Sequence, residues 1–232
     1  MAHRPRKRFG QNFLIDSNII QSLVSAIAPK ESDNILEIGP GLGALTKPLL
    51  EKVQHLEVVE LDRDLIHKLE LISKQTGKMT IHECDALKFD YSQTELERRI
   101  VGNLPYNIST PLIFHLLEHV NSIKDMHFML QNEVVDRICA RIGDRNYGRL
   151  SIMVQVQCDT KKLIHVPAES FSPAPKVESA FIRLSPHKQP LVPKNLYANF
   201  KHMVRICFAQ PRKTVNNNLK EILTSNEINE VG

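Results

Sequence analysis

"LEIGPGLGALT", residues 36–46, joins the end of an apolar strand, a loop with three glycines and the first turn of a helix. Gly39, Gly41 and Gly43 let the backbone turn tightly and approach a ligand closely beneath the N-terminus of that helix. The stretch therefore predicts a strand, loop and helix unit with a ligand site at the loop.

The segments on both sides of this loop alternate between strand and helix patterns. Strands are predicted at 34–39, 55–61, 79–84, 98–103 and 125–131. Helices are predicted at 18–27, 43–53 and 62–72, and a further helix is capped by Thr110 and opened by Pro111. Five strands with helices between them predict an α/β fold on a doubly wound, parallel sheet.

The second half of the chain is less regular. Residues 150–157 alternate like a strand, although so short a run also fits a helix. Two further strands, at 161–167 and 178–186, would add a hairpin to the edge of the sheet.

A proline-containing linker separates these strands from the end of the chain. Past it, helices are predicted at 195–209 and 214–224. We therefore expect a main domain of residues 1–186 and a small helical domain of residues 187–232.

Composition excludes several classes of protein. Of 232 residues, 42% are hydrophobic and 24% are charged, which is ordinary for a globular chain. The four cysteines lie far apart and form no C-x-x-C pair, so the sequence argues against disulfides and a zinc site. No apolar run approaches the roughly 18 residues of a membrane helix, and no secretory signal is evident. We expect a soluble, cytoplasmic protein without metal or membrane association.

The net charge of +4 is unevenly distributed. Residues 1–10 carry four Lys or Arg and no acid, and residues 186–232 carry seven against three Glu. Basic ends on a mildly acidic body indicate a polyanion held at the periphery, although solvated helix faces would have the same composition.

Two acids follow the next strands of the predicted sheet. Glu60 ends the second strand, 21 residues after Gly39, where a carboxylate accepts hydrogen bonds from ribose hydroxyls. Asp85 ends the third strand, where it is placed to accept a hydrogen bond from an adenine amine. Each residue singly is also compatible with ordinary turn chemistry.

The spacing of the glycines separates two classes of cofactor. The loop reads G-x-G-x-G, whereas dinucleotide-binding dehydrogenases use G-x-G-x-x-G around a pyrophosphate. A ligand with adenine, ribose and an ammonium but no phosphate is S-adenosylmethionine, which the sequence favours over NAD.

"VGNLPYNIST", residues 101–110, ends the fourth predicted strand beside the same crevice. The amine of adenine is nearly planar and a poor nucleophile, so two fixed acceptors would help by favouring a tetrahedral nitrogen. The Asn103 side-chain oxygen and the Leu104 carbonyl, held by the bend at Pro105, are the candidates. Tyr106 offers a flat face on which an extruded base can stack. A simple strand-end turn is the alternative for this motif alone.

With these motifs in place, the chain resembles the ribosomal RNA adenine dimethyltransferases. The resemblance extends over nearly the whole length, through RFGQNFL (8–14), EIGPGLGALT (37–46), VELDRD (59–64), CDAL (84–87), GNLPYNISTPL (102–112), MHFMLQNEVVDR (126–137), YGRLS (147–151) and FSPAPKVESA (171–180). It implies a class I S-adenosylmethionine-dependent methyltransferase fold with a mainly parallel seven-stranded sheet and a small C-terminal helical domain. It also implies that residues 150–157 are helical.

The resemblance assigns roles by position. The implied cofactor-binding residues are Asn12, Leu14, Gly39, Gly41, Glu60, Asp85 and Asn103, of which the first two contact the methionine part. The implied catalytic residues are Asn103, Leu104, Pro105, Tyr106 and Phe171, with Phe171 as a second aromatic opposite Tyr106. By composition alone, Phe171 fits core packing better. Arg205, Arg212 and Lys213 are expected to bind RNA.

Within this family the motifs favour dimethylation of two adjacent adenosines near the 3′ end of 16S rRNA in the 30S subunit or its precursor, by a monomeric enzyme. One alternative is the branch that modifies 23S rRNA and confers antibiotic resistance. Another is a ribosome assembly factor that kept the fold without catalysis. The family's helical domain usually continues beyond the last residues seen here, "SNEINEVG".

Overall fold

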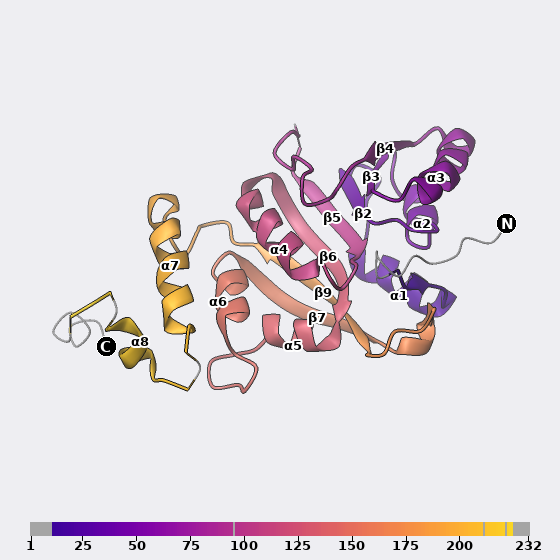
Figure 1. Ribbon diagram of the computed structural model, residues 1–232. Coiled ribbons are helices and arrows are strands. Elements are labelled where there is room, and N and C mark those ends of the chain that lie inside the picture. The colour runs from indigo at the N-terminus through magenta and orange to yellow at the C-terminus, as the bar shows by residue number, and fades with distance from the viewer. Residues whose placement is uncertain (1–10, 95, 211, 221, 225–232) are drawn as a thin grey trace.

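A seven-stranded sheet forms the centre of the computed structural model, which describes residues 11–94, 96–210, 212–220 and 222–224 (Figure 1). Its strand order is β4-β3-β2-β5-β6-β9-β7. The strands are β2 (Ile35–Ile38), β3 (Leu56–Glu60), β4 (Met79–Glu83), β5 (Arg98–Asn103), β6 (Ile123–Gln131), β7 (Cys158–Val166) and β9 (Ser179–Pro186). The first five in spatial order pair in parallel, and β9 and β7 add an antiparallel edge. This arrangement confirms the predicted α/β fold, including the hairpin at the edge.

Six helices cover the two faces of the sheet. The core on one face contains side chains of α1 (Ser17–Ile27), α2 (Thr46–Leu50) and α3 (Arg63–Thr76). The core on the other face contains side chains of α4 (Ser109–Glu118), α5 (Asn132–Ile138) and α6 (Arg149–Gln155). The sheet is therefore doubly wound, as the alternation of segments predicts.

The strands have apolar residues on both faces because both faces are covered. In β2, Leu36 and Ile38 belong to one core and Ile35 to the other. In β5, Ile100 and Val101 divide in the same way. The sheet order reverses between these two neighbouring strands, so their carboxyl ends flank the crevice at which such sheets bind ligands.

A second sheet of two short strands lies outside the main one. β1 (Phe13–Leu14) pairs antiparallel with β8 (Phe171–Ser172) and brings the two ends of the main fold together. The Ile15 N–H extends the contact by donating to the Ser170 carbonyl at 2.9 Å. Two-residue strands carry no periodic signal, and the sequence did not predict this pair.

Residues 150–155 are helical, within α6, and residues 156–157 form a turn, so the strand interpretation is wrong. The buried residues of α6 are Leu150, Ser151, Met153 and Val154, which have helical rather than alternating spacing. The Ser151 hydroxyl donates to the Arg137 carbonyl at 2.6 Å and so joins α6 to α5. The resemblance to the methyltransferase family predicted this helix correctly.

Two other helix predictions need correction. The cap position of α4 is Ile108 rather than Thr110, and no side chain caps it. The Ser109 hydroxyl instead donates to the Tyr106 carbonyl at 3.1 Å. The helix predicted at 43–53 is shorter, because residues 41–45 form turns before α2 begins.

The last described part of the chain forms α7 (Tyr197–Cys207) and α8 (Val215–Leu219), set apart from the sheet (Figure 1). The Gln157 side chain donates to the Tyr197 hydroxyl at 2.7 Å and anchors the start of α7. The remaining short helices are 3₁₀ turns, η2 (Val120–Ser122), η3 (Ala168–Ser170) and η4 (Lys194–Leu196). None of the helices in the described ranges is long and apolar enough to cross a membrane.

Candidate active site

The glycine loop after β2 has the backbone conformation that its sequence predicts. Gly39, Gly41 and Gly43 have φ of 66°, 59° and 84°, in the left-handed region that other residues rarely adopt. A Cβ on Gly41 would lie 3.2 Å from the Phe13 ring. The loop is therefore glycine-rich for conformation, and at Gly41 also for close packing against the N-terminal segment.

Glu60, at the end of β3, is held by backbone N–H groups. Its Oε1 accepts from Leu61 and Asp62, each at 2.9 Å, and its Oε2 accepts from Gly41 at 3.4 Å. Burial raises the pKa of Glu60, and this effect outweighs the three hydrogen bonds, which lower the pKa. The carboxylate is thus fixed at the pocket wall, with one lone-pair site of Oε2 left for a further donor.

Asp85, two residues beyond β4, occupies the next strand end. Its Oδ1 accepts from the Leu87 N–H at 2.9 Å in a tight turn. Glu60 and Asp85 therefore face the same crevice from neighbouring strands, as the sequence predicts.

Glu37 is a third acid of the site, to which sequence reasoning assigned no role. It is 2% exposed, and the Thr46 hydroxyl donates to its Oε2 at 2.7 Å. Burial raises the pKa of Glu37 to about 8, and the negative charge of Glu60 adds to the shift. The sequence held a signal for Glu37, since it is an acid inside an otherwise apolar strand.

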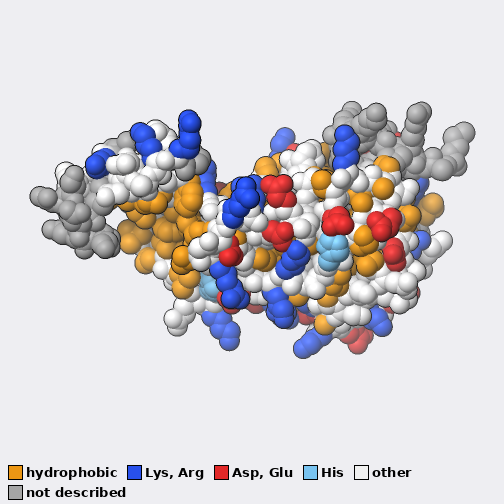
Figure 2. Space-filling view, turned by 90° about the horizontal axis from the view of Figure 1, so that it is seen from below, with side chains coloured by type: hydrophobic (Ala, Val, Ile, Leu, Met, Phe, Trp, Pro, Cys, Tyr) orange, Lys and Arg blue, Asp and Glu red, His pale blue; other side chains and the backbone are white. Residues whose placement is uncertain are grey.

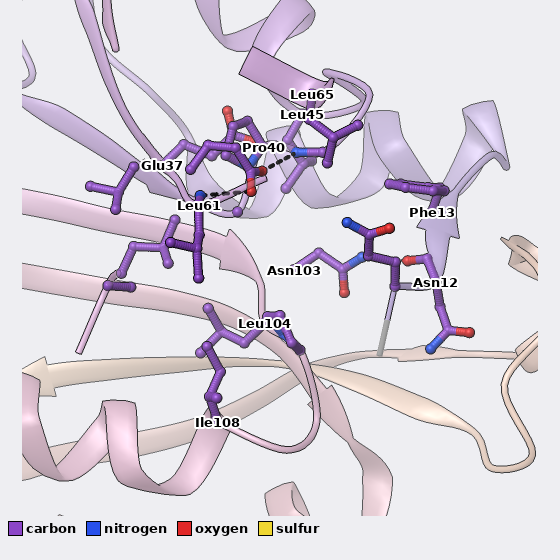
Figure 3. Close-up of a pocket in the computed structure, with 18 of the residues that line it drawn as sticks. Asn12, Phe13, Glu37, Pro40, Leu45, Leu61, Leu65, Asn103, Leu104 and Ile108 are labelled. Carbon is purple, nitrogen blue, oxygen red and sulfur yellow. Dashed lines mark hydrogen bonds between the residues drawn. The ribbon is translucent and has the colours of Figure 1, made fainter. Parts of the chain in front are cut away.

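These residues surround a pocket of about 280 Å³. Figure 3 shows it between the strand ends and the segment that carries Asn12 and Phe13. Ten of the predicted site residues line it: Asn12, Leu14, Gly39, Gly41, Glu60, Asp85, Asn103, Leu104, Pro105 and Tyr106. The pocket thus unites the predicted cofactor-binding residues with the Asn-Leu-Pro-Tyr motif.

Asn103, the last residue of β5, contacts the N-terminal segment. Its Nδ2 donates to the Asn12 carbonyl at 3.0 Å. Because a carbonyl only accepts, this bond fixes which way the amide points. Asn103 Oδ1 therefore remains an acceptor, while Leu104 beside it is buried and donates its N–H to the Met129 carbonyl at 3.2 Å.

Gly102 explains how β5 approaches β2 so closely before this motif. A Cβ at this position would lie 2.5 Å from the Ile38 carbonyl oxygen, closer than real Cβ contacts allow. Glycine is thus required for packing, and it brings Asn103 next to the glycine loop.

The Tyr106 ring lines the pocket and is anchored at its far end. Its hydroxyl shares a 2.8 Å hydrogen bond with the Ser179 hydroxyl at the start of β9. Burial raises the pKa of Tyr106, so the phenol is neutral at physiological pH. Ser179 holds the ring in place, and sequence reasoning did not identify it because the two residues are 73 positions apart.

The structure does not bring every predicted site residue to the pocket. Phe171 is 3% exposed and lies in the core beside Leu14, its partner in the small sheet. Arg205 is exposed on α7, and Arg212 and Lys213 are exposed between α7 and α8. The basic residues at positions 1–10 lie outside the described residues.

The charges of the side chains that line the pocket distinguish S-adenosylmethionine from a dinucleotide as the cofactor. Among the described residues that line the pocket, three are acids and none is Lys or Arg. A pyrophosphate would have no cation there, whereas a ligand with positive charge, ribose and adenine finds carboxylates at successive strand ends. The residues fit S-adenosylmethionine and argue against a dinucleotide.

Fold and pocket together define a class I S-adenosylmethionine-dependent methyltransferase. A model of the family "Ribosomal RNA adenine dimethylase" matches residues 2–231, and the chain belongs to this family. It is accordingly an rRNA adenine dimethyltransferase, and S-adenosylmethionine is its methyl donor.

Curated relatives and solved structures agree with this assignment. The chain is 52% identical to "Ribosomal RNA small subunit methyltransferase A" of Marinomonas sp., over 97% of this chain and 86% of that relative. It is 49% identical to the protein of the same name from Legionella pneumophila strain Lens, over 100% and 91%. A dimethyladenosine transferase from Plasmodium falciparum superposes with a TM-score of 0.81 at 31% identity, covering 94% of this chain and 77% of that one.

A further solved structure bears on the fold alone. The 23S rRNA methyltransferase ErmE superposes with a TM-score of 0.78 at 23% identity, over 94% of this chain and 88% of that one. Both branches considered from the sequence thus share the architecture, and the fold does not distinguish their substrates.

Proposed function

We propose that this enzyme dimethylates N6 of two adjacent adenosines near the 3′ end of 16S rRNA, in the small ribosomal subunit or its precursor. The relatives named above as small-subunit methyltransferases, at 49% and 52% identity, support this substrate over 23S rRNA. The observation that carries the proposed chemistry is the Asn103 amide, which lines the pocket and whose nitrogen is held by the Asn12 carbonyl.

The chemistry explains why an oxygen is needed there. The lone pair of adenine N6 is delocalised into the ring, so the amine must become more tetrahedral to act as a nucleophile. S-adenosylmethionine supplies an electrophilic methyl group when bound. Asn103 Oδ1 and the Leu104 carbonyl accept the N6 hydrogens, and this stabilises the reactive geometry without a strong base.

The base itself must leave its stack to reach the pocket. Tyr106 provides a ring face for it, and such stacking contributes about 1–3 kcal/mol per base. We assign Phe171 as the opposite face of the sandwich. Since Phe171 is buried and pairs with Leu14 in the small sheet, this role requires the small sheet to shift when RNA binds.

The C-terminal helices supply the contact to the rest of the RNA in this proposal. Figure 2 shows Lys and Arg side chains gathered on one side of this part of the molecule, with hydrophobic side chains on the other. Arg205, Arg212 and Lys213 are exposed and are assigned to phosphate binding, with residues 187–232 as the RNA-binding domain. The enzyme would act as a monomer in the cytoplasm, where ribosomal subunits are assembled.

The test is methylation of purified rRNA substrates. Small subunits from cells lacking the activity, and protein-free 23S rRNA, are incubated with enzyme and S-adenosylmethionine, and their nucleosides are analysed by mass spectrometry. We expect dimethyladenosine at two adjacent positions of 16S rRNA and none in 23S rRNA. Methylation of 23S rRNA, or of neither RNA, would refute the proposal.

A further inference from the structure

Residues 11–14, called the strap below, cross the edge of the pocket and are held at several points. Phe13 packs against the glycine loop at Gly41, and Phe13 and Leu14 pair with β8. All four residues of the strap line the pocket. In Figure 3, Asn12 and Phe13 lie beside Asn103, on the opposite side of the pocket from Leu61.

One end of the strap is fixed to the side of the pocket that carries Glu60. Gln11 Nε2 donates to Asp62 Oδ2 at 2.9 Å. Asp62 is 2% exposed, its Oδ1 accepts from the Asp64 N–H at 3.2 Å as the cap of α3, and its own N–H donates to Glu60. The Gln11 side chain is therefore tied to the same turn that holds the Glu60 carboxylate.

The neighbouring residue of the strap contacts the transfer site. The Asn12 carbonyl accepts the hydrogen bond from Asn103 Nδ2, across 91 positions of sequence. A carbonyl that moved away would leave the Asn103 amide free to rotate about its last torsion, which has a broad, soft potential. The position of the strap thus decides where Asn103 Oδ1 points.

We propose that Gln11 is a positioning residue for methyl transfer. Its hydrogen bond to Asp62 holds the strap so that the Asn12 carbonyl keeps the Asn103 oxygen directed at the substrate amine. The inference deepens the proposed function and rests on it for the identity of that amine. Gln11 acts through Asn12 and Asn103, so its loss affects turnover more than cofactor affinity.

A charge change with a compensating partner tests this role. Gln11→Glu places a carboxylate against Asp62, and the two repel each other. Adding Asp62→Asn restores a hydrogen bond of reversed direction, since the new amide nitrogen donates to the new carboxylate. The amide oxygen still caps α3, because Asn is as good a cap as Asp. The matched control is Gln93→Glu, which breaks an exposed Gln–Asp hydrogen bond of 2.8 Å to Asp90 outside the pocket.

We expect Gln11→Glu to lower kcat about tenfold or more, consistent with the loss of one hydrogen bond to a charged group, and to change the Kd of S-adenosylmethionine less than about threefold. The double variant should recover most of the kcat, and Gln93→Glu should match the wild type. An undiminished kcat in Gln11→Glu, or no recovery in the double variant, would overturn the inference.

A second readout does not depend on catalysis. The side-chain amide signal of Asn103 in NMR spectra, assigned by its disappearance in Asn103→Asp, reports the hydrogen bond to Asn12 through its hydrogen exchange. We expect slow exchange in the wild type and the double variant and fast exchange in Gln11→Glu. Equal exchange in all three overturns the strap's role even if the rRNA substrate differs from the one proposed. If the wild type leaves 16S rRNA unmethylated but the three proteins show the expected exchange pattern, only the proposed rRNA substrate is refuted.

Discussion

The two halves of the pocket are held by different kinds of contact. On the cofactor half, Glu60 accepts two hydrogen bonds from the N–H groups one and two positions later in the chain and a longer one from Gly41, and Asp85 accepts one from the N–H group two positions later. On the transfer half, Asn103 and Tyr106 are fixed by partners 91 and 73 positions away. The cofactor half is therefore held mainly by its own turns, whereas the transfer half depends on contacts that only the assembled fold provides.

The largest effect is expected at Asn103. Asn103→Ala removes the acceptor that stabilises the reactive amine, and losses of about 10²- to 10³-fold in kcat are typical for such groups. Affinity for S-adenosylmethionine should remain nearly unchanged, because the carboxylates of the other half keep their own hydrogen bonds. Single-turnover methylation and calorimetric titration measure the two quantities.

Asn121→Ala, at an exposed position outside the pocket lining, is the control. An Asn103→Ala variant with unimpaired turnover would show that the Asn103 oxygen takes no part in methyl transfer and would remove the distinction between the halves.

Glu60→Ala should show the opposite pattern. Loss of the carboxylate raises the Kd of S-adenosylmethionine about tenfold to hundredfold, as expected when hydrogen bonds to a charged group are removed, while kcat at saturation changes little. Glu97→Ala, at an exposed acid away from the pocket, is the control. Equal losses of affinity and rate in Glu60→Ala and Asn103→Ala would show that the two halves act as one unit.

Gly102→Ala tests the backbone contact that joins the halves. The added methyl group meets the Ile38 carbonyl at 2.5 Å, so we expect a loss of stability of about 1–3 kcal/mol, the usual range for overpacking. Urea unfolding followed by circular dichroism measures it.

Gly148→Ala is the comparison variant, since its Cβ meets no atom within 4 Å and its φ of −168° is extended backbone. It should lose no more than the cost of a weakened helix cap, up to about 1 kcal/mol. Equal losses in the two variants would contradict the steric explanation.

The last comparison concerns the pH dependence of stability. Glu37 has a folded pKa of about 8 against an ordinary value of 4.5, so the folded state keeps a proton that the unfolded state releases. Stability contributed by this group is complete below pH 4.5 and is lost as the pH rises to about 8. The slope is at most about 1.4 kcal/mol per pH unit for one proton.

Glu37→Gln should flatten this part of the curve, because the amide resembles the protonated acid. Unfolding free energies at pH 5 and pH 9 for both proteins provide the measurement. A steeper decline in the variant than in the wild type would show that Glu37 is ionised in the fold.

The same contrast explains what the sequence could and could not predict. The strands, the glycine loop, Glu60 and Asp85 follow from sequence patterns, because periodicity locates the strands and each acid stands at or just after a strand end. Residues 150–157 misled the strand interpretation, since Ile152, Val154 and Val156 alternate in sequence although Leu150, Met153 and Val154 form the buried face. Asn103 was identified because its motif has a chemical meaning that does not require its partner.

The missed features are all long-range. Ser179 behind Tyr106, Gln11 on Asp62 and the pairing of β1 with β8 join residues that only the folded chain brings together. Phe171 illustrates the converse, because the family resemblance implies an aromatic face for the base, whereas composition favours core packing and the structure buries the ring in the core.

Strand β9 connects the transfer site to the segment that leads to the C-terminal helices. It begins at Ser179, which holds the ring of Tyr106, and ends at Pro186, where the chain leaves for the C-terminal helices. Seven residue steps of an extended strand span roughly 23 Å. If those helices bind RNA as proposed, β9 sets this part of the distance between the RNA contact and the base that stacks on the ring.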